Sequence, residues 1–219
     1  MKSLYDSAWH HPFVAYVVGL CLLVALARRL PFLYAYLTVF LLLILADATV
    51  TGAWSPVPMG TPAYTAFSVL FIILGDLRYF VLAERVTEPE RPFFRSLRFS
   101  LPISFAIPLA TEIMRQTLPF MQNDRVLYVV YEGAMVVLVL ALDRFRFARR
   151  SVDPALTRWV HEVSLLFAAL YFGWASCDVL ILCGVELAHV LRIVPNVLYY
   201  GALLPFIFAR APESQKTLR

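Results

Sequence analysis

Six polar side chains stand inside long apolar stretches of this 219-residue chain, and they are the residues that could do chemistry. They are Asp47, Asp76, Glu132, Asp178, Arg192 and Asn196. An ionisable group within hydrocarbon costs from about 2.5 kcal/mol upward, so such a group serves a function or is paired with another. Carboxylates could bind a proton, an ion or a polar substrate, and Arg192 would balance their charge. Asn196 follows a proline, which frees a backbone carbonyl one turn earlier, so it is a candidate ligand contact.

The depth of these acids in their segments predicts where a substrate would enter. Asp47, Glu132 and Asp178 fall in the half of the membrane that we expect to be outer, and Asp76 falls in the inner half. The pattern predicts a polar cavity that opens to the outside, bounded by the second, fifth, sixth and seventh spans, with Asp76 at an inner gate. The alternative is a structural network of charges that joins helices. Arg78 should extend toward the cytoplasmic surface.

One further charged pair has a structural explanation. Glu112 and Arg115 are three residues apart, so they share one face of a helix. Opposite charges at this spacing favour an ion pair, and we predict one here.

Seven apolar segments must position all these side chains. Hydrophobic residues make up 61% of the chain, and its mean hydropathy is +0.73, which is far above the values of soluble domains. Most segments approach the roughly 17–25 residues that a helix needs to cross hydrocarbon, and none shows the alternation of a membrane barrel. The sequence therefore predicts an all-α bundle in one domain, 1–219, with helices at about 13–27, 31–49, 64–84, 97–117, 126–142, 159–183 and 187–209.

The basic residues predict the orientation of this bundle. Of 19 lysines and arginines, 14 fall on one side of the predicted spans, so the positive-inside rule places the N-terminus outside and the C-terminus in the cytoplasm. The first and last three spans also show weak self-similarity, in which Asp47 corresponds to Asp178 and Gly75 to Gly201. This fits a parallel 3+1+3 repeat, and chance recurrence of short apolar words is the alternative.

Several well-known catalytic arrangements are missing from the sequence. His161 and His189 are expected at opposite ends of the membrane, about 30 Å apart, so they cannot share a metal ion. There is no GxSxG motif, and the only lysines, Lys2 and Lys216, lie outside the spans, which excludes a retinal Schiff base. We expect neither a metal nor a cofactor.

Together these features predict a small multi-pass transporter for a small molecule or ion, in the plasma membrane of a bacterium. Two alternatives stay open. One is an intramembrane lipid-modifying enzyme that uses carboxylates, and the other is a non-catalytic subunit or sensor of a larger membrane complex. Membrane lipids are expected partners, a homo-oligomer or a partner complex fits the pattern, and the basic rim faces anionic headgroups, so no nucleic acid is needed to explain the net charge of +4.

Overall fold

The computed structural model describes residues 31–52, 55–88, 92–150 and 153–216, and in these ranges it contains helices and no strand. The all-helical class is thus confirmed for the described part of the chain. The first predicted span, 13–27, lies outside it. Six helical stretches are long and apolar enough to cross a membrane, which fits a multi-pass membrane protein. They are Phe32–Thr51, Pro62–Thr87, Phe93–Thr117, Asp124–Arg150, Pro154–Leu182 and Leu187–Arg210.

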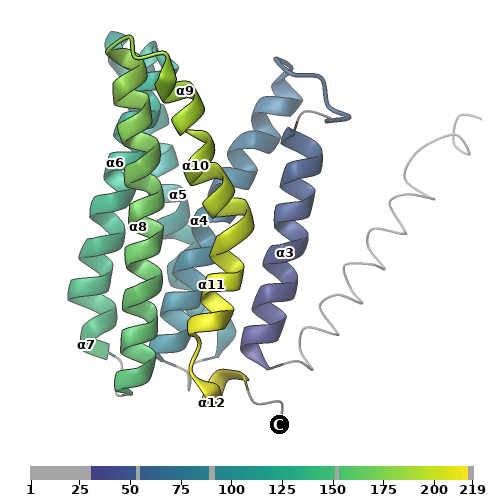
Figure 1. Ribbon diagram of the computed structural model, residues 1–219, viewed down its shortest axis with the longest axis vertical. Coiled ribbons are helices and arrows are strands. Elements are labelled where there is room, and N and C mark those ends of the chain that lie inside the picture. The colour runs from purple at the N-terminus through teal and green to yellow at the C-terminus, as the bar shows by residue number, and fades with distance from the viewer. Residues whose placement is uncertain (1–30, 53–54, 89–91, 151–152, 217–219) are drawn as a thin grey trace, which may run out of the picture.

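The long helices stand side by side as a bundle (Figure 1). Of the six spans in the described ranges, four are continuous helices and two are interrupted. The continuous ones are α3 (Phe32–Thr51), α4 (Pro62–Thr87), α5 (Phe93–Thr117) and α8 (Pro154–Leu182).

The fourth span joins α6 (Asp124–Leu142), the π-helix η2 (Asp143–Phe147) and α7 (Ala148–Arg150). The last span joins α9 (Leu187–Leu191), α10 (Ile193–Val197), the π-helix η3 (Leu198–Ala202) and α11 (Leu203–Arg210). Two short elements complete the described chain, the 3-10 helix η1 (Pro119–Gln122) and α12 (Glu213–Lys216).

Local sequence signals explain where several helices begin. Thr61 caps α4 by accepting a hydrogen bond from the backbone N–H of Tyr64 at 3.2 Å, and Pro62 occupies the first helical position. Asp153 caps α8 in the same way, with its carboxylate 2.8 Å from the N–H of Ala155. Proline suits the first turn because its missing N–H would have no helical partner there.

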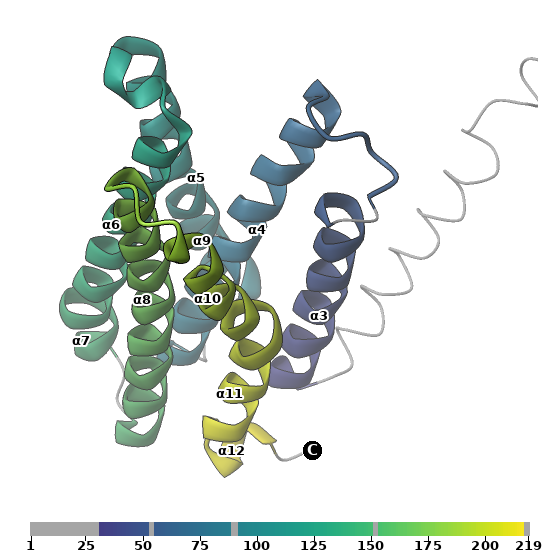
Figure 2. The ribbon, with the colours of Figure 1, turned by 45° about the horizontal axis from the view of Figure 1, so that its top comes forward.

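Helix α4 is central to the bundle over its second half. Every residue from Asp76 to Glu84 is buried, although a helix at the edge of a bundle would bury one stripe only. The helix packs against α3, α5 and α8, while α6 and α8 form the most extensive pair. Figure 2 shows α4 passing between α3 and the α6–α8 pair. The side chains of α4 therefore contact most of the other spans, and three of its buried side chains are charged, Asp76, Arg78 and Glu84.

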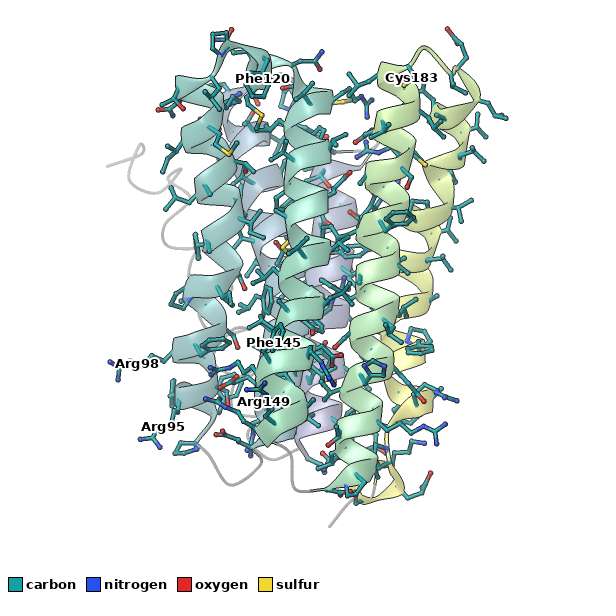
Figure 3. All side chains as sticks on the ribbon, turned by 90° about the vertical axis from the view of Figure 1, so that its left-hand side faces the viewer. Arg95, Arg98, Phe120, Phe145, Arg149 and Cys183 are labelled. Carbon is teal, nitrogen blue, oxygen red and sulfur yellow. The ribbon has the colours of Figure 1, made fainter. Side chains whose placement is uncertain are left out.

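The two ends of the bundle differ in charge. One end, which we call the arginine-rich end, includes Arg95, Arg98 and Arg149, whereas Phe120 and Cys183 mark the opposite end (Figure 3). At the arginine-rich end, the buried carboxylate of Glu84 accepts hydrogen bonds from Arg146 Nε at 3.0 Å and Nη2 at 2.8 Å.

A buried hydrogen bond joins α4 to α8 between these ends. The hydroxyl of Tyr79 lies 2.8 Å from Ser164 Oγ, and Ser164 donates its own hydrogen to the carbonyl of Val160 at 2.7 Å. A serine hydroxyl has one hydrogen, so Tyr79 is the donor. The ring of Tyr79 also stacks on Phe167, with centroids 4.8 Å apart.

We expect Tyr79→Phe to lower the free energy of unfolding by about 1 kcal/mol, because the change removes one buried hydrogen bond and keeps the stacked ring. Unfolding by sodium dodecyl sulfate in mixed micelles would measure it. Tyr128→Phe is the matched control, since the ring of Tyr128 lies 5.5 Å from the Arg192 guanidinium and needs no hydroxyl for that contact. Equal stability of both variants would contradict the prediction.

Candidate functional site

Asp76 is the most enclosed acid of α4, and two tyrosines hold it. Its side chain is 0% exposed. Tyr131 of α6 donates a hydrogen bond to Oδ2 at 2.6 Å, and Tyr171 of α8 donates to Oδ1. Each carboxylate oxygen thus has a phenol donor, and no cation lies within ion-pair distance in the described part of the chain. This cluster fixes α4 against the α6–α8 pair.

Arg78 lies one half-turn further along α4 and does not extend to the surface. The expectation that it reaches the cytoplasmic side is wrong, because its side chain is 1% exposed and its guanidinium lies over the ring of Tyr199, 4.2 Å from the centroid. The contact is a cation–π interaction with η3, which compensates part of the desolvation of the charge. Two of its nitrogens, Nε and Nη2, have no hydrogen-bond partner in the described structure.

A narrow cleft lies beside Arg78, between α3, α4 and η3. Its walls are mostly apolar, and its polar side chains are Asp47, Arg78 and Tyr199. The lining residues are Phe40, Leu43, Ile44 and Asp47 from α3, Phe71, Leu74, Gly75 and Arg78 from α4, and Tyr199 from η3. The sequence predicted a cavity between the second, fifth, sixth and seventh spans, whereas this cleft lies between the second, third and last ones.

The π-helix η3 brings Tyr199 against α4. A π-turn inserts an extra residue into a helix, is uncommon, and often occurs at functional sites. Here it places the Tyr199 ring over Arg78 and its hydroxyl against Gly75, where a Cβ atom would overlap that oxygen. Gly75 is therefore required by close approach of a side chain rather than by backbone conformation.

Asp47 connects α3 to η3 at the other wall of the cleft. Its Oδ1 accepts a hydrogen bond from Thr51 Oγ1 at 2.7 Å, and its Oδ2 accepts one from the hydroxyl of Tyr200 at 2.9 Å. Both oxygens keep capacity for a further donor, because a carboxylate oxygen accepts two bonds. Asp47 thus closes the cleft and could also contact a ligand in it.

Trp174 links the Asp76 cluster to the cleft. Its ring centroid is 5.4 Å from that of Tyr171 and 5.1 Å from that of Tyr199. Its indole N–H donates to Asn196 Oδ1 at 2.7 Å. Asn196 does not line the cleft, and its side-chain oxygen accepts the indole hydrogen. Its described role is to orient the tryptophan.

Glu132 and Asp178 form a separate network with two arginines. Asp178 is 0% and Glu132 3% exposed. Arg192 Nη2 lies 3.1 Å from Glu132 Oε1 and 3.1 Å from Asp178 Oδ2, and Arg125 Nη1 lies 2.8 Å from Asp178 Oδ1. Two acids thus face two arginines, and the charge of the group is balanced. Arg125 was not among the site residues predicted from the sequence. It lies at the start of α6, where an arginine resembles a charge at the membrane surface.

The other predicted positions lie apart from these groups. Arg115 Nε and Nη2 contact the two carboxylate oxygens of Glu112 at 2.8 and 3.0 Å, on an exposed face of α5. Among the residues that the structure describes, no group of three His, Cys, Asp or Glu side chains could hold a metal ion. Tyr131 was not predicted as a site residue, because its position one residue before Glu132 does not by itself indicate a role in a site.

The candidate site is therefore the cleft with Arg78, Asp47 and Tyr199, backed by Asp76 and its tyrosines. Comparisons with protein-family models, with curated proteins and with solved structures gave no match to this chain.

Proposed function

We propose that this protein is a small membrane transporter that binds its substrate in the cleft between α3, α4 and η3. The observation that carries the proposal is Arg78, a buried charge at membrane depth that lines the cleft with two unpartnered nitrogens. Burial of such a charge is costly, and intramembrane charges of this kind typically mark substrate or ion pathways. A ligand that pairs with Arg78 would repay this cost.

The interrupted last span supports movement as well as binding. It changes from α-helix to π-helix and back beside the cleft, and it contains Pro195 and Pro205. Transporters often place their substrate at broken helices, where the helix can change shape without exposing backbone to lipid. In the proposed orientation, with the arginine-rich end in the cytoplasm of a bacterial cell, Asp47 lies in the outer half and the cleft would open to the outside.

The Asp76 cluster would serve as the inner gate. It fastens α4 to α6 and α8 through Tyr131 and Tyr171, while Arg78 on the same helix contacts the ligand. A shift of Arg78 on ligand binding would move α4 as a whole, because the second half of this helix is packed on all sides. Glu132, Asp178 and Arg192 would hold the outer ends of α6, α8 and the last span together.

A mass-spectrometric comparison followed by uptake tests the proposal. Small molecules would be extracted from wild-type protein in lipid nanodiscs and from Ile44→Trp, in which a bulky ring fills the cleft. We expect a compound that is present with the wild type and lost in the variant, and that wild-type proteoliposomes take up while variant proteoliposomes do not.

Two results would replace transport by another function. Conversion of the bound compound in detergent, where no gradient exists, would identify a membrane enzyme. A protein that co-purifies in fixed stoichiometry, together with an Ile44→Trp variant that keeps all function in the assembly, would identify a subunit of a complex.

A further inference from the structure

We propose that a groove at the arginine-rich end of the bundle binds the headgroup of an anionic phospholipid, with Arg158 and Arg210 on its phosphate. The groove is separate from the cleft at Arg78, so this inference does not depend on the proposed transport function. It follows from the size of the groove, from the charges on its walls and from its position at the ends of two spans.

The groove lies between the first turns of α8 and the end of α11. Its volume is about 300 Å³, which reaches the roughly 300–1,000 Å³ of sites for small molecules. Its polar side chains are Arg158, Glu162 and Arg210, and its other lining residues include Trp159 and two alanines, Ala155 and Ala209.

The walls of the groove are joined by the buried ring of Trp159. The indole N–H of this residue donates a hydrogen bond to the backbone carbonyl of Ile207 at 3.0 Å, which fixes α8 against α11. Alanine on both sides leaves the space between the two helices open. The groove is therefore a built feature of the bundle with room for a phosphate and its substituents.

Two arginines share one acid in this groove. Glu162 Oε1 accepts a hydrogen bond from Arg158 Nε at 3.0 Å, and Glu162 Oε2 accepts one from Arg210 Nε at 2.6 Å. Among the described residues, neither arginine has another hydrogen bond or ion pair, so Nη1 and Nη2 of both stay available to a ligand. Two positive charges and one negative charge sum to +1, which matches the single charge of a phosphodiester. Arginine is well suited to such a group because its planar fork fits phosphate oxygens.

The position of the groove favours a lipid over a soluble phosphate. Arg210 is the last residue of the last span and Arg158 is the fifth residue of α8, so both lie where the spans meet the headgroup layer. Basic pockets between spans bind phospholipid headgroups in this position. Leu165 and Phe172 follow Arg158 at seven-residue spacing on the same face of α8, and their side chains are 48% and 65% exposed. An acyl chain of the bound lipid would run along this apolar face.

Native mass spectrometry of the full chain, titrated in detergent micelles with dioleoyl phosphatidylglycerol, tests the inference. We expect one tightly bound molecule, and about tenfold or weaker binding of dioleoyl phosphatidylcholine, whose headgroup has no net charge. The double variant Arg158→Gln/Arg210→Gln should weaken binding of phosphatidylglycerol about 10- to 100-fold, because it loses the hydrogen bonds between charged groups.

The matched control is Arg95→Gln/Arg98→Gln. These two arginines are exposed on α5 at the same end of the bundle (Figure 3), so the control changes the net charge by the same amount and leaves the groove intact. It should bind phosphatidylglycerol within about threefold of the wild type, since distant charges are screened by salt. An equal loss of affinity in the control and in the groove variant would mean that the whole rim attracts the lipid, and would overturn the inference.

A third variant tests the space rather than the charge. Ala209→Trp keeps both arginines and fills the groove, so it should lose phosphatidylglycerol binding as well. The replaced side chains of all these variants are exposed, so each variant should fold. Phosphatidylcholine that binds as tightly as phosphatidylglycerol, binding that survives in Ala209→Trp, or inorganic phosphate that binds as tightly as the lipid would each overturn the inference.

Discussion

An Arg192→Gln variant is expected to lose about 3–5 kcal/mol of stability, the largest effect of any single change considered for this protein. Arg192 is the cation that faces both Glu132 and Asp178, and each of these acids is almost completely buried. Without it, two buried carboxylates share Arg125 alone, and they repel each other. Removal of one member of a buried ion pair is costly because the remaining charge stays desolvated. Unfolding in mixed micelles, followed by tryptophan fluorescence, would measure the change.

The double variant Arg192→Gln/Glu132→Gln separates charge balance from loss of packing. It removes one acid with one base, so Asp178 keeps Arg125 at 2.8 Å and the group is balanced again. We expect it to be more stable than Arg192→Gln alone. Arg115→Gln is the control, since its pair with Glu112 is exposed and is worth about 1 kcal/mol or less. If the double variant were the less stable one, the network would not be held together by charge.

The same experiment distinguishes the two explanations of the acids that the sequence left open. Under the proposed transport function, a structural network predicts that the double variant folds and keeps the uptake of the wild type. A substrate role for Glu132 predicts that it folds and does not transport. The contacts with Arg125 and Arg192 favour the structural explanation for this pair, and the proposed function places the substrate beside Arg78 instead.

The sequence predicted the charged side chains whose burial costs free energy better than it predicted their partners. Asp76 and Asp178 are recognisable because a charge within an apolar segment stands out without any structure. Their partners depend on how each helix is rotated about its axis, and residue types alone do not determine that. Tyr131 and Arg125 show this, since the first resembles any core aromatic and the second resembles a boundary charge until α6 is packed against α4 and α8.

Irregular backbone was predicted in part. The proline before Asn196 predicted a backbone carbonyl freed from the last span, and the described helix changes to a π-helix at Leu198, shortly after it. The π-helix contains Gly201, but one glycine does not distinguish a π-turn from an ordinary α-helix, so the position of Tyr199 over Arg78 could not be predicted. The orientation of the bundle and the parallel repeat stay predictions. Gly75 and Gly201 correspond in that repeat, but only Gly75 has a side chain against it within the described structure.

One helix connects the candidate ligand to the rest of the bundle. Arg78 faces the cleft, Asp76 is fixed to α6 and α8, and Glu84 is paired with Arg146 at the arginine-rich end, all within nine residues of α4. Occupation of the cleft can therefore affect three neighbours of α4 at once. The contact that sets the position of α4 relative to the cleft is that between Gly75 and Tyr199.

We expect Gly75→Ala to destabilise the protein by about 1–3 kcal/mol, although alanine is the better helix former. The new methyl group would overlap the hydroxyl of Tyr199, and the ring cannot move freely because it packs on Arg78 and Trp174. Gly133→Ala in α6 is the matched control. Apart from the adjoining residues and the backbone of its own helix, no atom lies within 4 Å of a Cβ at that position, so this change should be neutral or stabilise the helix by about 0.5–1 kcal/mol.

Tyr199→Phe should rescue Gly75→Ala, because it removes the atom that the methyl group overlaps. The double variant is expected to be more stable than Gly75→Ala alone, with a coupling of about 0.5–3 kcal/mol in a double-mutant cycle. It keeps the aromatic ring over Arg78, so the packing of η3 against α4 should return with stability. A cycle without coupling would mean that Gly75 and Tyr199 are not in contact in the membrane, and the arrangement of η3 against α4, on which the cleft depends, would then be wrong.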